Sequence, residues 1–257
     1  RISRKEGKDQ MKDSFRNINR REFVIAGGAA MGTLAAAAGA GQAPSAGKSR
    51  LAMVGTGSRG IGMWGSPVVR DYSDRIEMVG LCDVNPKRAR VAERLIRSNL
   101  QNMDGHLSRS EDTAGSGRVD ASIPVYTDFD RMIRETRPDR VIVTTMCSTH
   151  IQYVIRALEL GCDVICEKPF GTDEEQCQAV IEAQNKYSNN KVTVTFNARY
   201  GASATRVKEL LREKAIGDLL SVDYAEFLND DHGTSYFRRW HGIKENSGTL
   251  LVHKASH

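Results

Sequence analysis

Short apolar runs alternate along the chain with longer stretches whose apolar residues recur at helical spacing. The apolar runs predict strands at residues 51–54, 76–82, 125–126, 140–145, 163–166 and 191–197. The amphipathic stretches predict helices at residues 87–98, 128–136, 149–160 and 173–187. Strands that alternate with helices predict an α/β fold with a parallel, doubly wound sheet, which binds ligands at its carboxyl edge.

Two stretches depart from this alternation. Residues 99–122 are polar and contain several glycines, and we expect a surface insertion there. Gly65 and Pro67 fall inside the helix expected after the first strand. Because proline removes a helical N–H, this helix should kink or restart near Pro67.

The pattern changes from residue 199 onward. A helix at 204–214 is followed by alternating residues at 219–228, which predict a half-exposed antiparallel strand. We therefore expect a leader at 1–40, a dinucleotide-binding domain at 41–198, and the start of a second, α+β domain at 199–257. This last part has too few expected strands to cover a sheet face, so we expect it to be incomplete.

A glycine-rich turn, Gly55-Thr-Gly57-Ser-Arg-Gly60, follows the first strand. Gly55 allows a sharp turn, Gly57 lets a pyrophosphate approach the backbone, and Gly60 lets the next helix pack on the sheet. Backbone N–H groups at the start of that helix, around Ser58 and Arg59, would hold the phosphate charge with the helix dipole. The turn therefore predicts a dinucleotide site, and the alternative is a purely structural turn.

Asp83 directly follows the second predicted strand, 23 residues beyond Gly60. A carboxylate at this strand end can accept hydrogen bonds from both ribose hydroxyls of the dinucleotide. Its negative charge would also repel a 2′-phosphate. The sequence therefore predicts NAD as the cofactor in preference to NADP.

The net charge of +5 is concentrated in the leader. Residues 1–40 hold eight Lys/Arg and four Asp/Glu, which leaves 29 basic and 28 acidic residues in 41–257. This balance does not support a nucleic-acid surface. Arg20-Arg21 precede a Gly/Ala-rich stretch at 24–40, which resembles a twin-arginine signal and predicts export to the periplasm or beyond, without a stable membrane anchor. The alternative is a chance arginine pair before an amphipathic helix.

Two further motifs follow predicted strands. Glu167-Lys168-Pro169 comes directly after the strand at 163–166, and Thr145 and His150 follow the strand at 140–145. With the glycine turn, these motifs resemble the Gfo/Idh/MocA oxidoreductase family. The family pattern has a proline after the threonine, where this chain has Met146.

This resemblance covers residues 50–257 and implies both a fold and an activity. The implied fold is an N-terminal Rossmann domain followed by a C-terminal domain with an open, mainly antiparallel sheet. Family members oxidise or reduce sugars, inositols and related polyols with NAD(P). The open sheets of the family often pair, so the resemblance also implies a homo-oligomer.

The resemblance assigns Lys168 both to catalysis and to the cofactor, and places Thr145, His150 and Glu167 beside the cofactor. A cation between nicotinamide and substrate would polarise a hydroxyl and stabilise developing alkoxide charge. We expect His150 to start a helix near the nicotinamide rather than to perform catalysis. The alternative for Lys168 is a surface residue at a strand end.

The resemblance also implies a catalytic base. Family members carry an Asp and a His four residues apart on one helix face, after a Gly-Gly segment. Here His257 occupies the position of the base, and His253 occupies the position of the substrate-binding Asp. The missing negative charge leaves open a histidine-rich polyol site, a different reaction, or two histidines without function. Paired imidazoles can also ligate zinc, but no third ligand is identifiable and we expect no metal.

Other residues near the expected cleft are assigned to substrate binding: Asn197, Arg199, Tyr200, Arg239 and Trp240. Aromatic rings suit sugar faces, and arginine suits hydroxyls or carboxylates; the alternative role is packing between domains. The five cysteines are odd in number and lack paired metal spacing, so we expect Cys162 and Cys166 to be small core residues.

These observations predict an exported NAD-dependent oxidoreductase that transfers a hydride between nicotinamide and a sugar or polyol. A first alternative is a redox-neutral glycosidase or epimerase with permanently bound NAD, because free NAD is scarce outside the cytoplasm. A second alternative is a non-catalytic nucleotide- or sugar-binding protein.

Overall fold

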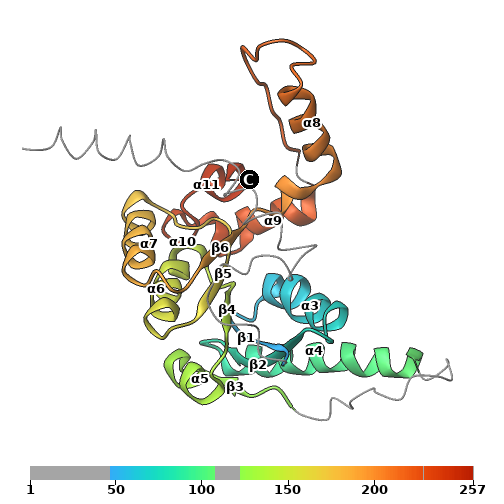
Figure 1. Cartoon of the computed structure of the whole chain (residues 1–257), viewed down its shortest axis with the longest axis vertical. Helices are drawn as coiled ribbons and strands as arrows, with labels where there is room; N and C mark the ends of the chain where they lie inside the picture. The colour runs from blue at the N-terminus through green and yellow to red at the C-terminus, as the bar shows by residue number, and fades with distance from the viewer. Residues whose placement is uncertain (1–46, 108–121, 228, 257) are drawn as a thin grey trace, which may run out of the picture. The chain divides into compact units, whose positions relative to one another are not determined.

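The computed structural model describes residues 47–107, 122–227 and 229–256. Within them, a parallel sheet carries helices on both faces (Figure 1). The leader predicted at 1–40 lies outside the described residues, and so does much of the insertion predicted at 99–122. Among the helices that the structure describes, none is both long and apolar enough to cross a membrane.

The sheet has six strands in the order β3-β2-β1-β4-β5-β6, and all neighbouring pairs are parallel. The strands are β1 (Ser49–Val54), β2 (Ile76–Cys82), β3 (Val125–Tyr126), β4 (Arg140–Val143), β5 (Asp163–Glu167) and β6 (Val192–Thr195). This is the strand order of a Rossmann fold, and it confirms the predicted α/β class. The strand order reverses at β1, so the turn after β1 opens where such sheets bind ligands.

Helices cover both faces of this sheet: α3 (Ser66–Asp71), α4 (Pro86–Leu107), α5 (Phe129–Thr136), α6 (His150–Glu159) and α7 (Glu174–Lys186). Strand β1 shows why both faces need cover, since its successive side chains point to opposite sides. Ala52 and Val54 belong to the cluster that α5, α6 and α7 complete, whereas Leu51 and Met53 pack with α3 and α4. The core is therefore two apolar layers separated by the sheet.

The helix after the glycine turn changes type instead of stopping. A π-helical segment, η1 (Gly60–Gly65), runs into α3, where Pro67 lies in the first turn. Proline has no N–H to donate to the preceding turn, so the hydrogen-bond pattern of the helix changes there. Gly65 is needed for packing, because a Cβ there would lie 2.6 Å from Cδ1 of Ile96 on α4. The irregularity predicted near Pro67 is confirmed as this change of helix type.

One helix runs further than predicted. Helix α4 continues to Leu107, whereas the pattern predicted its end at residue 98. No proline interrupts residues 99–107, so the backbone hydrogen bonds continue after the apolar spacing fades. The first part of the predicted surface insertion is therefore helical.

The strand predicted at 219–228 is wrong for residues 219–227, the part that the structure describes. Helix α8 (Ala202–Arg212) confirms the helix predicted at 204–214, but the residues after it make no strand pairing and are exposed. A strand needs a neighbouring edge for its backbone hydrogen bonds. The described residues contain no strand after β6 that could supply such an edge.

The described residues from 230 to 256 form four short helical elements: α9 (Asp230–Arg238), η4 (Trp240–Gly242), α10 (Lys244–Ser247) and α11 (Leu250–Ala255). Gly248, between α10 and α11, has a φ of +80°, and a Cβ there would lie 3.1 Å from the carbonyl oxygen of Thr172. This glycine lets the last helices approach the loop that follows β5. The domain boundaries at residues 40 and 198 stay predictions.

Candidate active site

The glycine turn is held tightly at two of its three glycines. Gly55 has a φ of +89°, and a Cβ there would lie 2.6 Å from the backbone of Thr144 and Thr145. The Thr144 hydroxyl donates to the carbonyl oxygen of Gly55 at 2.5 Å, and a Cβ on Gly60 would lie 2.9 Å from that hydroxyl oxygen. A Cβ on Gly57 would meet nothing within 4 Å. Only Gly57 of the three therefore borders open space.

Asp83 holds the glycine turn from the side of β2. Its Oδ2 accepts from the Thr56 backbone N–H at 2.9 Å and from the Thr56 hydroxyl at 3.0 Å, while Oδ1 accepts from the Asn85 N–H at 2.9 Å. The carboxylate is buried, and the Arg88 guanidinium lies 3.6 Å from Oδ1. Asp83 thus stands where the sequence placed it, but it also shapes the turn. The partner Thr56 was not predicted.

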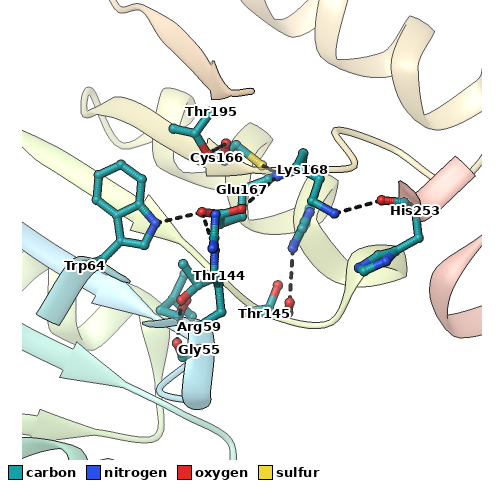
Figure 2. Close-up of polar contacts among 12 residues, drawn as sticks. Gly55, Arg59, Trp64, Thr144, Thr145, Cys166, Glu167, Lys168, Thr195 and His253 are labelled. Atoms are coloured by element: carbon teal, nitrogen blue, oxygen red, sulfur yellow. Dashed lines mark hydrogen bonds and ion pairs between the residues drawn. The ribbon is translucent and has the colours of Figure 1, made fainter. Parts of the chain in front are cut away.

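Glu167 holds the turn from the side of β5, as Figure 2 shows. Its Oε1 accepts from Nε of Arg59 at 2.8 Å and from Nε1 of Trp64 at 2.9 Å, and its Oε2 accepts from the Lys168 N–H at 3.2 Å. The Glu167 side chain is only 4% exposed, so its charge depends on these donors. The sequence marked Glu167 and Arg59 as cofactor residues, but not Trp64. The structure therefore joins the glycine turn and the Glu-Lys-Pro motif into one site.

Lys168 lies half-buried at the carboxyl end of β5 and points toward α11 (Figure 2). Its Nζ donates to the carbonyl oxygen of His253 at 2.7 Å, and the peptide bond to Pro169 is cis. Burial, followed by the positive charge of Lys254, lowers the pKa of the Lys168 ammonium. An ammonium that gives up its proton more readily is suited to proton transfer at a reacting oxygen.

His150 links the loops after β4 and β5. It is the first residue of α6, as predicted, and it is buried. Its Nδ1 lies 2.9 Å from the carbonyl oxygen of Pro169, and its Nε2 lies 3.0 Å from that of Thr145. Burial lowers the pKa of the imidazole. Since both ring nitrogens lie within hydrogen-bond distance of backbone carbonyls, His150 lies between the two loops, and its assignment to the cofactor stays a prediction.

A half-buried aromatic cluster, formed by Tyr236, Trp240, His241 and His253, lies beside Lys168. The Tyr236 hydroxyl is hydrogen-bonded to Nδ1 of His253, and the His241 ring packs edge-on against His253 at 5.1 Å between centroids. Trp240 stacks on His241 at 3.7 Å. Burial, then the charge of Lys168, lowers the pKa of His253 to about 3. His253 is therefore a neutral imidazole at pH 7.

Comparison with known proteins shows which family this fold belongs to. Residues 49–196 match the family model described as an oxidoreductase family with an NAD-binding Rossmann fold, Gfo/Idh/MocA. The chain belongs to the Gfo/Idh/MocA oxidoreductase family. The family predicted from the glycine turn and the Glu-Lys-Pro motif is thus confirmed, and so is NAD as the cofactor of this Rossmann fold.

Individual relatives show how far the likeness extends. The Bacillus subtilis protein YteT is 34% identical over 209 residues, covering 80% of this chain and 44% of YteT. Inositol 2-dehydrogenase of Salmonella typhimurium is 28% identical over 166 residues, covering 63% of this chain and 43% of that enzyme. The chain thus spans less than half the length of these curated relatives.

A solved structure shares the fold. Scyllo-inositol dehydrogenase from Lactobacillus casei, with bound NAD(H) and scyllo-inositol, superposes with a TM-score of 0.52 at 21% identity. The superposition covers 67% of this chain and 43% of that enzyme. At this identity the likeness extends to the Rossmann fold and not to the substrate.

The residues of this family member fit NAD on three structural grounds. Gly57 leaves open space beside backbone N–H groups at a helix start, which is what a pyrophosphate needs. The Thr145 Oγ1 is buried and has no hydrogen-bond partner among the described residues, so it can serve a bound group. Asp83 retains acceptor capacity, because a carboxylate has more lone pairs than its present donors use.

Other predictions concern the catalytic base and the residues assigned to substrate binding. His257, the predicted base, lies outside the described residues. Asn197, Arg199 and Tyr200 form the exposed turn η3 (Asn197–Tyr200) after β6, and the Arg199 guanidinium lies over the ring of Phe196. Arg239 is exposed next to Trp240. These residues stay predictions for substrate binding.

Two further predictions concerned the cysteines and a possible zinc site. All five cysteines are free thiols, and Cys162 and Cys166 are buried as predicted. In residues 47–107, 122–227 and 229–256, no group of three or more His, Cys, Asp or Glu side chains is arranged to hold a metal ion. The zinc alternative includes His257, so it involves a residue outside that part of the chain.

Proposed function

We propose that this chain is part of an NAD-dependent oxidoreductase that transfers a hydride between nicotinamide and a sugar or polyol. The observation that carries the proposal is the Glu167 carboxylate, which binds Arg59 and Trp64 of the glycine-turn region and the Lys168 N–H of the Glu-Lys-Pro motif. The glycine turn at residues 55–60, which we call the cofactor cradle, and the half-buried Lys168 are thereby held at one edge of the sheet. The match to oxidoreductases supports the reaction class.

The cofactor cradle uses the backbone more than side chains. The N–H groups near Gly57, Ser58 and Arg59 bind the pyrophosphate at the helix start. The Asp83 carboxylate accepts hydrogen bonds from the ribose hydroxyls. Glu167 keeps Arg59 and Trp64 in place beneath this cradle. The Thr145 hydroxyl, which lacks a partner among the described residues, is a further polar contact for the cofactor.

Lys168 provides the charge that the reaction needs. When bound, NAD supplies a nicotinamide carbon that accepts or returns the hydride. The Lys168 ammonium donates a hydrogen bond to the reacting substrate oxygen and stabilises negative charge that develops on it. Its lowered pKa favours proton transfer to and from that oxygen. The proposal keeps His257 as the base.

The binding half of this proposal is tested with two glycine variants of the purified chain. We expect Gly57→Ala to weaken NAD binding about tenfold or more, because its Cβ enters the space the pyrophosphate needs. Gly62→Ala is the matched control, since its Cβ also meets nothing within 4 Å but lies further along η1. Calorimetric titration with NAD measures both variants. Equal binding by Gly57→Ala and the unaltered chain would contradict the cradle.

The chemical half is tested with Lys168→Met. We expect turnover with sugars or polyols to fall roughly 100- to 1,000-fold, as when one charge-stabilising donor is removed, while NAD affinity stays the same. NADH formation and a separate NAD titration provide the two readouts. Unchanged turnover would instead support a non-catalytic or different role.

The mode of NAD binding separates a dehydrogenase from a redox-neutral enzyme. We propose exchangeable NAD, which dialysis removes, because net oxidation requires the cofactor to leave after each turnover. Native and denaturing mass measurements on freshly purified protein detect any retained nucleotide. NAD that survives dialysis would favour a glycosidase or epimerase with a closed redox cycle.

We further propose that the protein is exported by the twin-arginine route and forms a homo-oligomer. The support for export is the arginine pair and the Gly/Ala-rich stretch at 24–40. Fusion of residues 1–46 to a reporter that is active only after export tests this proposal. Replacing Arg20 and Arg21 together by lysine should then abolish export of the fusion. Sedimentation of the purified chain measures the oligomeric state.

A further inference from the structure

Lys168, at the carboxyl end of β5, contacts the backbone of His253, and Lys254 is the next residue of α11. Lys168 Nζ donates to the carbonyl oxygen of His253 at 2.7 Å and keeps two N–H donors for other partners. The side chain of Lys254, the residue after His253, is only 15% exposed, and its Nζ lies 3.6 Å from Oε1 of Glu226. After burial, the Lys254 charge is the next contribution to the lowered pKa of Lys168.

Tyr236 determines what His253 offers to a ligand. The phenol hydroxyl is bonded to Nδ1 of His253, and a phenol O–H is a stronger donor to a neutral imidazole nitrogen than the reverse. Because the pKa of His253 is lowered to about 3, the ring carries one proton at pH 7. With Nδ1 accepting from Tyr236, this proton is on Nε2. His253 therefore offers a hydrogen-bond donor.

Two acids lie near these groups, and each of them faces a cation. Glu167 is buried beneath Arg59 and Trp64, and Glu226 faces Lys254. After burial, the neighbours that lower the pKa of His253 are cations or imidazoles: Lys168, His241, Lys254 and His150. The site beside Lys168 thus combines several donors with positive charge.

We propose that Lys168, Lys254 and His253 recognise a carboxylate of the substrate, so that the enzyme acts on an acidic sugar, with Tyr236 as a positioning residue. The hydroxyls of a neutral polyol both donate and accept, and their protons need acceptors that these three groups do not supply. A carboxylate offers acceptors only, and its hydrogen bonds to ammonium groups are charge-assisted. This inference rests on the proposed function, since it names the substrate class of the same site.

Matched sugar pairs test the charge preference. D-glucuronate and D-glucose differ only in a carboxylate against a hydroxymethyl group, and D-galacturonate and D-galactose form a second pair. We expect the acid of at least one pair to bind the NAD-loaded chain about 10- to 100-fold more tightly, the gain from one hydrogen bond to a charged group. Calorimetry measures all four sugars. Equal binding within both pairs, tighter binding of the neutral sugars, or no binding of either acid overturns the proposal.

Two substitutions test the groups that carry the charge preference. His253→Asp replaces the donor by an anion, and we expect it to abolish the preference for the acid. Lys254→Gln should weaken binding of the acid about tenfold and leave the neutral sugar unchanged. Lys208→Gln removes an equal charge from the exposed helix α8 and should change neither. An effect of Lys208→Gln equal to that of Lys254→Gln would overturn the assignment.

Tyr236→Phe tests the positioning role. This variant keeps the ring but lets the His253 proton move to either nitrogen, so the acid-to-neutral affinity ratio should fall while NAD affinity is retained. His253→Asn in the Tyr236→Phe background restores a fixed amide donor and should recover part of the ratio. Equal weakening of both sugars, or loss of NAD binding, would show a merely structural role for Tyr236.

The controls separate this inference from the proposed function. If the unaltered chain fails to bind NAD, or Lys168→Met retains full turnover, the proposed function fails. If NAD binds and Lys168→Met is inactive but neither acid is preferred, only the carboxylate proposal fails.

Discussion

Residues 49–196 and residues 202–227 are both supplied with apolar side chains at regular spacing, yet only the first region buries them. Leu81 of β2 is 0% exposed between the sheet and its helices, whereas Leu220 is 95% exposed. The two leucines have the same transfer free energy and differ only in whether a surface lies against them. A pattern therefore indicates which face can be buried, and a partner surface decides whether burial happens.

The packed and the exposed regions also contribute differently to the candidate site. The cofactor cradle lies at the edge of the well-packed sheet, where Asp83 and Glu167 depend on a rigid core for their hydrogen bonds. The exposed segment contributes Glu226, which faces Lys254 across a distance of 3.6 Å. The packed region therefore holds the glycine turn, while the last helices bring His253 to Lys168.

The sharpest test of this contrast is the core leucine. We expect Leu81→Ala to reduce the free energy of unfolding by about 2–5 kcal/mol, because it removes buried methyl groups and leaves a cavity between the sheet and the helices α3 and α4. Urea unfolding of the purified chain, followed by circular dichroism, measures the loss. A change below about 1 kcal/mol would mean that β2 is far less well packed than its burial indicates.

The glycine turn should show the next largest effect. We expect Gly55→Ala to cost roughly 1–3 kcal/mol from its left-handed backbone alone, with a further cost from the contact to Thr144. Gly57→Ala is the control in the same turn, because its Cβ meets nothing within 4 Å, and its unfolding free energy should stay almost unchanged. The same urea titration compares them. Equal destabilisation of the two variants would contradict the turn geometry.

Acid should weaken the site beside Lys168 before it neutralises most carboxylates. The pKa of His253 is lowered from 6.5 to about 3 in the folded chain, so below pH 6.5 the unfolded state binds the proton first. Its contribution to stability is therefore complete above pH 6.5 and is lost as the pH falls toward 3. In His253→Gln the fall in unfolding free energy between pH 7 and pH 4 should be smaller. An unchanged slope, measured by urea unfolding at several pH values, would contradict the lowered pKa.

The smallest effect is expected in the exposed segment. Leu220→Ala should change the unfolding free energy by no more than about 0.5 kcal/mol, since the side chain is in water in both states. Paired with Leu81→Ala under identical conditions, this variant isolates the partner surface from the residue type. A loss comparable to that of Leu81→Ala would show that this segment is buried in solution.

Most of the Rossmann fold could be predicted from the sequence because its signals are local and agree with one another. The glycine turn, the apolar runs and the motif Glu167-Lys168-Pro169 each follow from neighbouring residues. The bond between Trp64 and Glu167 could not be predicted, because it joins residues 103 positions apart and requires the π-helical segment. The pairing of Tyr236 with His253 was missed for the same reason, since only the packing of α9 beside α11 brings them together.

The strand at 219–228 is the reverse case, because the sequence predicted an element that residues 219–227 do not form. Alternating residues such as Val222 and Tyr224 have a real preference for an extended backbone. That preference is worth little without a neighbouring strand, and none is available to this segment among the described residues.

The sequence by itself determined the α/β class, the cofactor turn and the family, because periodicity, glycine conformation and charge placement act over short distances. Only the tertiary structure decided that Asp83 and Glu167 brace the turn from two sides and that His253 is a neutral donor beside two lysines. Hydrogen-bond partners and buried charges depend on which distant side chains share a space, and that is set when the layers pack together.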